Sequence, residues 1–246
     1  MTDTIIKIHN LDKTYKKTIG NPEKAVLNGL NMQVNKGDIY GLVGRNGAGK
    51  TTLLKCITGL ILPTSGSIEL FGENNPDRLY EYRAKIGGIV EKPPLDGDFS
   101  AWDNLKVCAI RRGITDDRIN EVLDITGLSA HGEQTIKRSR VKTFSLGMKQ
   151  RLGISMALLS KPKLMIFDEP LNGLDPDGII WFRDLVLDLR ENGITFIISS
   201  HLLRELDEVA TCYGVMKNGR IIGYISAEEL KQSGEDFESY YRKVIK

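Results

Sequence analysis

The chain has few cysteines and no long apolar run. Its 246 residues include three cysteines, Cys56, Cys108 and Cys212, which are widely scattered and form no CxxC pair. This set indicates neither a disulfide framework nor a zinc site. No apolar stretch approaches the roughly 18 residues that cross a bilayer, and the N-terminal MTDTIIKIHN lacks a signal-peptide pattern. We therefore expect a cytoplasmic protein with reduced thiols.

Neither sign of charge dominates. The 34 Lys and Arg residues nearly balance the 32 Asp and Glu residues, for a net charge of +2. That balance argues against a dedicated nucleic-acid surface, and we expect no nucleic acid among the partners. The basic run at 137–140 is more often a solvated loop or helix end than a binding site. The content of 41% hydrophobic and 27% charged residues is typical of a folded globular protein.

Strand and helix patterns alternate along most of the chain, which predicts an α/β fold. Apolar strand patterns are found at Thr4–Ile8, Leu27–Val34, Ile39–Val43, Ser67–Phe71, Lys85–Val90, Leu164–Phe167, Thr195–Ile198 and Tyr213–Met216. Helical patterns are found at Thr51–Thr58, Ala101–Arg112, Asp116–Thr126, Leu146–Leu159, Gly178–Asn192, Leu202–Val209 and Ala227–Lys246. Turn residues predict a loop at Tyr15–Lys24 and a hairpin at Asn218-Gly219.

The order of these patterns predicts one domain, 1–246, with three parts. Residues 1–90 and 145–226 form the core, which begins with a β subdomain, and residues 91–144 form a helical subdomain inserted into it. The C-terminal tail, 227–246, has aromatic residues at roughly helical spacing, so we expect it to pack on the core.

The most informative stretch is GLVGRNGAGKTT at 41–52, which fills every fixed position of a phosphate-binding P-loop. Its glycines allow a tight turn in which successive N–H groups point at phosphate oxygens. The helix that follows adds its N-terminal dipole. Lys50 can reach the β- and γ-phosphates, and the Thr51 hydroxyl can hold Mg²⁺. We therefore predict that the chain binds a nucleoside triphosphate.

A second segment supplies the groups that hydrolysis requires. The apolar strand in LMIFDEP, 164–170, ends in Asp168, which beside a P-loop would coordinate Mg²⁺ directly or through water. Glu169 would lie toward the γ-phosphate, where a carboxylate can act as general base. Asp-Glu at a strand end is a weak signal alone, but it is strong after a complete P-loop.

Nearly the whole chain resembles the nucleotide-binding subunits of ATP-binding cassette (ABC) transporters. The segment FSLGMKQR, 144–151, is similar to the family's signature helix. The resemblance implies a P-loop NTPase (ABC ATPase) core with an antiparallel β subdomain and an α-helical subdomain, and ATP and Mg²⁺ as cofactors. It also implies that Ser145, Gly147 and Gln150 act in trans on ATP bound to a second nucleotide-binding subunit. An ordinary N-capped helix would explain Ser145 but not the whole octet.

Further roles follow from the same resemblance. Asp175 matches the D-loop, which implies a place at the dimer interface, and His201 matches the switch histidine, whose imidazole could bond to the γ-phosphate. Tyr15 resembles the aromatic residue that stacks on adenine. The implied catalytic residues are Glu169, His201 and Lys50. The implied ATP-binding residues are Tyr15, Gly44, Arg45, Asn46, Gly47, Ala48, Gly49, Lys50, Thr51 and Thr52.

Two positions depart from the common pattern of the family. Glu91 stands where most members have Gln, and the signature reads Ser-Leu-Gly where Ser-Gly-Gly is commoner. Both features, with the run SSHLL at 199–203, are similar to the subgroup of bacitracin-resistance and lantibiotic-immunity exporters. Glu91 could still ligate Mg²⁺, so the implied metal residues are Thr51, Asp168 and Glu91.

We therefore expect an ATPase subunit that drives export of a peptide or antibiotic through separate transmembrane permease subunits, from the inner face of the membrane. The alternative is a soluble ABC-type ATPase that acts on ribosomes or DNA, but such proteins usually carry tandem cassettes, coiled coils or zinc modules. A regulator without turnover is disfavoured by the intact set of Lys50, Asp168, Glu169 and His201.

Overall fold

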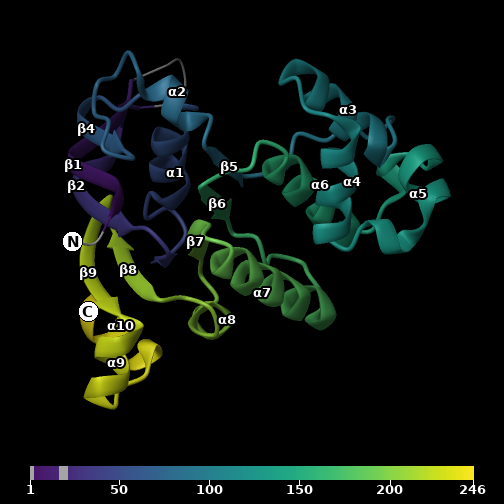
Figure 1. The fold of residues 1–246 in the computed structure, drawn as a ribbon. Helices are drawn as coiled ribbons and strands as arrows, with labels where there is room; N and C mark the ends of the chain where they lie inside the picture. The colour runs from purple at the N-terminus through teal and green to yellow at the C-terminus, as the bar shows by residue number, and fades with distance from the viewer. Residues whose placement is uncertain (1–2, 17–21) are drawn as a thin grey trace.

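The fold is built on two β-sheets with helices around them (Figure 1). The computed structural model describes residues 3–16 and 22–246. The larger sheet has the strand order β5-β6-β7-β3-β8-β9, and the smaller sheet has the order β2-β1-β4. This arrangement confirms the α/β fold predicted from the sequence.

The larger sheet is parallel except at one edge, where β9 runs antiparallel to β8. Its strands are β3 (Ile39–Val43), β5 (Ile86–Ile89), β6 (Leu164–Asp168), β7 (Thr195–Ser200), β8 (Cys212–Lys217) and β9 (Arg220–Ser226). The central strands β3, β6 and β7 are buried along their whole length, as is usual for parallel strands that are covered on both faces. The hairpin between β8 and β9 is confirmed at Asn218 and Gly219, which have φ values of 50° and 76°.

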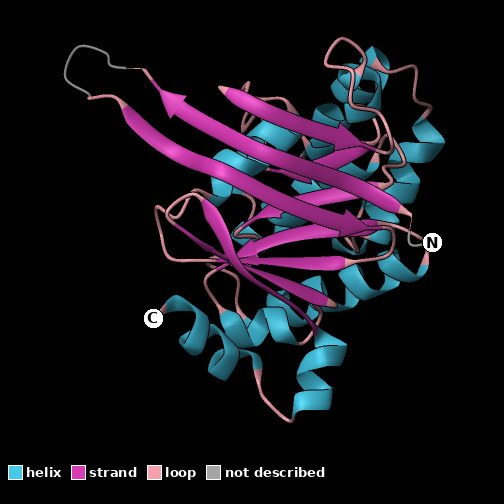
Figure 2. Cartoon of the chain, turned by 90° about the vertical axis from the view of Figure 1, so that its left-hand side faces the viewer, coloured by secondary structure: helices cyan, strands magenta, loops and turns pink. Residues whose placement is uncertain are grey.

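The smaller sheet is antiparallel and consists of β1 (Thr4–Tyr15), β2 (Lys24–Asn35) and β4 (Ser65–Leu70). Figure 2 shows its two long strands side by side. The predicted end of the first strand at Ile8 is wrong, because β1 continues to Tyr15 through several irregularities in its pairing. Asp12 lies in this irregular part, where its carboxylate accepts hydrogen bonds from Gly29 N (2.6 Å) and Ser65 Oγ (2.7 Å). Residues 17–21 of the predicted loop lie outside the described residues.

The helices divide into groups that cover different faces. They are α1 (Lys50–Thr58), α2 (Leu79–Arg83), α3 (Ala101–Arg111), α4 (Asp116–Ile125), α5 (Glu133–Arg138), α6 (Leu146–Leu158), α7 (Pro176–Glu191), α8 (Leu203–Asp207), α9 (Ala227–Ser233) and α10 (Phe237–Ile245). Helix α1 packs with the antiparallel sheet, and α3 to α6 lie together on the opposite side in Figure 1. Within residues 3–16 and 22–246, no helix has the length and apolar character needed to span a membrane.

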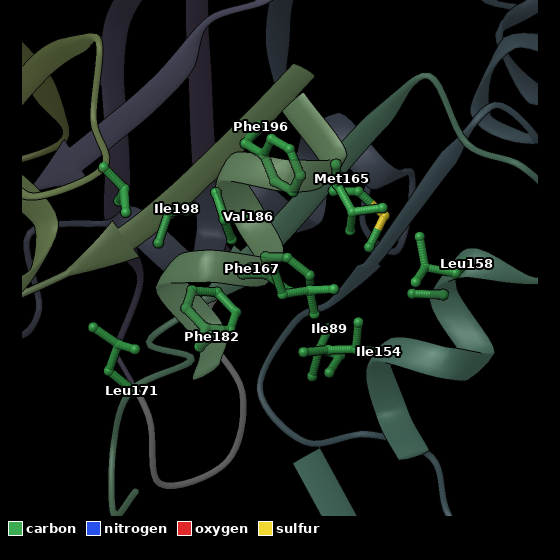
Figure 3. Packing of buried hydrophobic residues seen from close by; sticks show 14 of the residues in the cluster. Ile89, Ile154, Leu158, Met165, Phe167, Leu171, Phe182, Val186, Phe196 and Ile198 are labelled. Atoms are coloured by element: carbon green, nitrogen blue, oxygen red, sulfur yellow. The ribbon is translucent and has the colours of Figure 1, made fainter. Parts of the chain in front are cut away.

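The larger core lies between the parallel sheet and helices α6 and α7. Figure 3 shows Phe167 of β6 against Phe182 of α7, with ring centroids 5.4 Å apart, and Ile89 of β5 beside Ile154 of α6. Burial of such side chains contributes roughly 1.5–3 kcal/mol each. This packing fixes the ends of β5 and β6, where the functional residues begin.

The tail consists of two helices, where the sequence pattern predicted one. Gly234 ends α9 in a left-handed conformation with φ 68°, and Asp236 then caps α10. Phe237 of α10 is buried and stacks on Tyr213 of β8 with ring centroids 3.9 Å apart. The tail therefore packs against the β8 and β9 edge of the sheet.

We predict that only one thiol reacts quickly in the folded protein. Burial raises the pKa of Cys56 to about 11 and that of Cys212 to about 12. At pH 8 a thiol with a pKa of 11 is ionised in about one molecule in a thousand, and the thiolate is the reactive form. Cys108 is partly exposed on α3. Mass spectrometry after brief maleimide treatment should find label on Cys108, and equal labelling of all three residues would contradict the packing.

Candidate functional site

The P-loop connects a buried strand to a helix at the carboxyl edge of the parallel sheet. It runs from the end of β3 to the start of α1, as its sequence context predicted. Gly44 fits only without a side chain, because an added Cβ would lie 2.5 Å from the carbonyl oxygen of Met216. Gly47 and Gly49 have φ values of 82° and 111°, which disfavour other residues. The edge formed by the carboxyl ends of parallel strands is the usual ligand site of such sheets.

Lys50 is buried and is held by two oxygens. Its Nζ donates to Gly44 O at 2.7 Å and lies 3.1 Å from Oε1 of Glu169. Only 6% of the lysine side chain is exposed. A buried ammonium group requires such partners because the loss of its hydration is costly. The lysine of the P-loop and the carboxylate after β6 therefore lie in direct contact.

Asp168 connects three segments through its two oxygens. Thr51 Oγ1 of α1 donates to Oδ2 at 2.6 Å, and Ser199 Oγ of β7 donates to Oδ1 at 2.5 Å. The same Ser199 hydroxyl accepts from the backbone N of Glu169 at 2.9 Å. Asp168 is buried, and hydrogen bonds to a buried carboxylate are strong.

Glu169 lies between Lys50 and His201. Its Oε2 is 2.7 Å from Nδ1 of His201, while Oε1 contacts Lys50. The backbone of Glu169 has φ 52°, a left-handed conformation that costs free energy in a residue other than glycine and is common at functional sites. Both oxygens of this carboxylate are thus fixed in direction.

Most of the predicted ATP-binding residues line one cavity of about 500 Å³. Tyr15 at the end of β1 forms one wall, with 40% of its surface exposed and Lys13 Nζ 5.2 Å from its ring centroid. Glu169 also lines this cavity. From the predicted set the cavity is lined by Tyr15, Arg45, Asn46, Gly47, Ala48, Gly49, Lys50, Thr51 and Thr52, whereas Gly44 is not among the lining residues.

A second cavity, of about 670 Å³, is also lined by Glu169. Asp168 and Glu91 also line it, and so does Gln150, whose Nε2 donates to Pro170 O at 3.3 Å. The carboxylate of Glu91 is paired with Lys55 Nζ at 2.6 Å. Of the three predicted metal residues, Asp168 and Glu91 therefore share this cavity, and Thr51 contacts Asp168 from α1.

The residues predicted to act in trans are separate from the P-loop cavity of their own chain. Ser145 caps α6 by accepting from Met148 N at 3.2 Å, and an added Cβ at Gly147 would meet nothing within 4 Å. Asp175 is also a helix cap, for α7, and accepts from Gly178 N at 2.9 Å. Ser145 and Asp175 are exposed, so this surface is open to another molecule.

The donor set fits a small divalent cation. Thr51 and Asp168 place a hydroxyl and a carboxylate oxygen 2.6 Å apart beside the P-loop, and Glu91 adds a second carboxylate to the adjoining cavity. Hard oxygen donors of this kind are those that Mg²⁺ prefers. Among the residues that the structure describes, no group of three or more His, Cys, Asp or Glu side chains is placed to hold a metal ion.

Two residues of the site were missed by the sequence interpretation. In the sequence, Ser199 was noted only as part of the run SSHLL. The signal that could have indicated it is a polar residue at the end of an apolar strand, and that strand, β7, pairs with the P-loop strand β3. Lys55 gave no signal, because its partner Glu91 is 36 residues away and belongs to another element.

Comparisons with known proteins agree with this geometry. A family model described as ABC transporter matches residues 27–172. The lantibiotic transport ATP-binding protein SrtF of Streptococcus pyogenes is 43% identical over 241 residues, which are 98% of this chain and 97% of SrtF. The bacitracin transport ATP-binding protein BcrA of Enterococcus faecalis is 40% identical over 238 residues, which are 96% of this chain and 74% of BcrA.

A solved structure gives the same result for the fold. It is described as the ATP-binding subunit of an ABC transporter, and it matches this chain with a TM-score of 0.84 and 26% identity. The match covers 98% of this chain and 100% of the solved one.

We predict that Ser199→Ala lowers ATP turnover about tenfold or more, because it removes two hydrogen bonds with a net value of about 1 kcal/mol each. The variant removes the donor to Asp168 and the acceptor for Glu169 N. Steady-state phosphate release measures the effect. Ser200→Ala is the matched control, because the Ser200 hydroxyl bonds only to the Leu202 backbone among the described residues. Equal losses in the two variants would contradict this role for Ser199.

Proposed function

Because this chain belongs to the ABC transporter family as an ATP-binding and ATP-hydrolysing subunit, we propose that it drives export of a peptide antibiotic through separate permease subunits. The resemblance to the bacitracin and lantibiotic subgroup, predicted from Glu91 and the signature, is confirmed by the relatives. Their names describe transport, which favours this function over an ATPase of ribosomes or DNA.

The observation that supports hydrolysis best is the position of Glu169. This carboxylate forms part of the P-loop cavity and contacts both Lys50 and His201. In the proposed mechanism, P-loop N–H groups and Lys50 hold the phosphates of ATP. Mg²⁺, held by Thr51 and Asp168 and with Glu91 nearby, would supply charge neutralisation at the β- and γ-phosphates.

Glu169 then accepts a proton from the attacking water, and His201 orients the carboxylate and the γ-phosphate. Tyr15 offers its exposed ring to the adenine. The two fixed oxygens of Glu169 support this assignment, because an oriented base requires no rearrangement before proton transfer.

A second nucleotide-binding subunit, either a copy of this chain or a close paralogue, would complete the site. Ser145 and Gly147 at the exposed start of α6 would offer a hydroxyl and free N–H groups to the γ-phosphate on the partner subunit, together with Gln150. Asp175 would lie at the same interface. ATP would then join the two subunits, and its hydrolysis would release them.

The permease subunits would provide the path and the specificity for the solute. The cassette would attach to them on the inner face of the membrane, through the region of Glu91 and helices α3 to α6. We propose a peptide antibiotic as the solute because SrtF and BcrA are described as lantibiotic and bacitracin transport proteins.

We predict that Glu169→Gln lowers ATP turnover by about 100-fold or more, the effect typical of losing a general base. Binding of ATP should remain, because the P-loop is unchanged, and the stalled variant should form a dimer that is stable enough to detect by light scattering. Equilibrium binding of a fluorescent ATP analogue is the control. Turnover at the wild-type rate would show that Glu169 is not the base.

Transport is tested in the native host with the same substitution. A strain that carries only Glu169→Gln should become more sensitive to bacitracin or to a lantibiotic than the parent strain. Its sensitivity to an unrelated antibiotic that is not a peptide should be unchanged. The tagged chain should also co-purify with a multi-spanning membrane protein after detergent extraction. Recovery with ribosomal or DNA-associated proteins alone would contradict the transport function.

A further inference from the structure

We propose that Lys55 is a positioning residue that holds the Glu91 carboxylate in a fixed place on the wall of the cavity beside the phosphate site. This inference rests on the proposed ATP site and adds a residue that the motifs of the chain do not include. Lys55 Nζ and Glu91 Oε1 form an ion pair at a distance of 2.6 Å.

The geometry of α1 sets the direction in which Glu91 is held. Lys55 follows Thr51 by four residues and therefore lies on the same face of the helix, about 6 Å farther along its axis. Thr51 contacts Asp168, and Lys55, one turn later in the sequence of α1, binds Glu91. A single helix thus presents the P-loop lysine, the metal hydroxyl and a separate anchor for Glu91.

The charge of Glu91 explains why an anchor is useful. Its side chain lines the cavity that also contains Asp168 and Glu169, so the cavity already has two carboxylates before any phosphate enters. A third carboxylate that is free to move would repel the phosphates. Lys55 neutralises that charge and fixes its position.

The backbone of Glu91 supports a functional role for this pair. Glu91 has φ 73°, a left-handed conformation that is uncommon in a residue with a side chain. Two residues later, Pro93 packs against α6: an added Cβ at Gly153 would lie 2.7 Å from Cβ of Pro93 and 2.9 Å from Cδ1 of Ile89. Figure 3 shows Ile89 and Ile154 in the same contact region. The segment around Glu91 therefore contacts α6 on one side, and Lys55 joins it to α1 on the other.

The pair contributes little to the folded state, which makes it suitable for substitution. The Glu91 side chain is 60% exposed and that of Lys55 is 25% exposed. Exposed ion pairs stabilise proteins weakly, so the thermal midpoint of Lys55→Gln should fall by no more than about 4 °C. A larger fall would make the pair a structural bridge and would overturn the proposal.

The experiment is a double-mutant cycle with Lys55→Gln, Glu91→Gln and both together. Binding of a fluorescent ATP analogue is measured in EDTA, without metal, and ATP turnover is measured with Mg²⁺. With Glu91 present, Lys55→Gln should weaken metal-free binding and lower turnover by about fivefold or more, a coupling of about 1 kcal/mol. In the Glu91→Gln background the same change should have a much smaller effect. Lys55→Arg should restore both values, because a guanidinium group also pairs with a carboxylate.

The matched control is Lys92→Gln. Lys92 follows Glu91, lines the same cavity and is exposed, but it forms no ion pair among the described residues. Its removal should change binding by the same factor in both backgrounds, as expected for a long-range charge. If Lys55→Gln also acts by the same factor in both backgrounds, the pair has no positioning role and the proposal is wrong. A wild-type chain that does not bind ATP would instead contradict the proposed function itself.

Discussion

The site depends on the two hydrogen bonds that Asp168 accepts. Thr51 approaches from α1 and Ser199 from β7, so one buried carboxylate sets the distance between the P-loop helix and the two central strands. Each donor lies at the carboxyl edge of the parallel sheet, where neighbouring strands end together. The full burial of β3, β6 and β7 keeps that edge rigid.

The orientation of the Glu169 side chain depends on the same arrangement. Ser199 holds its backbone N, and the left-handed turn at Glu169 directs the side chain toward Lys50 and His201. The opposite charge of Lys50 and the ring of His201 then keep the carboxylate in one orientation. A strained backbone is stable here because three neighbouring segments over-determine it.

The features that could be predicted from the sequence are those that depend on the spacing of neighbouring residues. The P-loop, the Asp-Glu pair and the buried strands were recognisable because each is a contiguous pattern with a local physical cause. The strand irregularities around Asp12 were not, because they depend on Gly29 and Ser65, which belong to other strands. The short helices α2 and α5 were also missed, since five or six residues give too little periodicity.

Other parts of the site could not be predicted from the sequence because they depend on partners that are distant in the chain. Ser199 is 31 residues from Asp168, and Lys55 is 36 residues from Glu91, so only the fold brings each pair together. The motif residues are contiguous in the sequence, whereas the residues that support them are brought there by the topology.

Helix α6 contacts this site at two separate places. Gln150 donates to Pro170 O next to Glu169, and Gly153 packs on Pro93, two residues after Glu91. A shift of α6 would therefore reach both the proposed base and the proposed metal side at once. Because Lys55 ties Glu91 to α1, such a shift would act on the P-loop helix as well as on the loop. Coupling between the helical region and ATP then requires no long pathway, since both contacts lie within two residues of a carboxylate at the site.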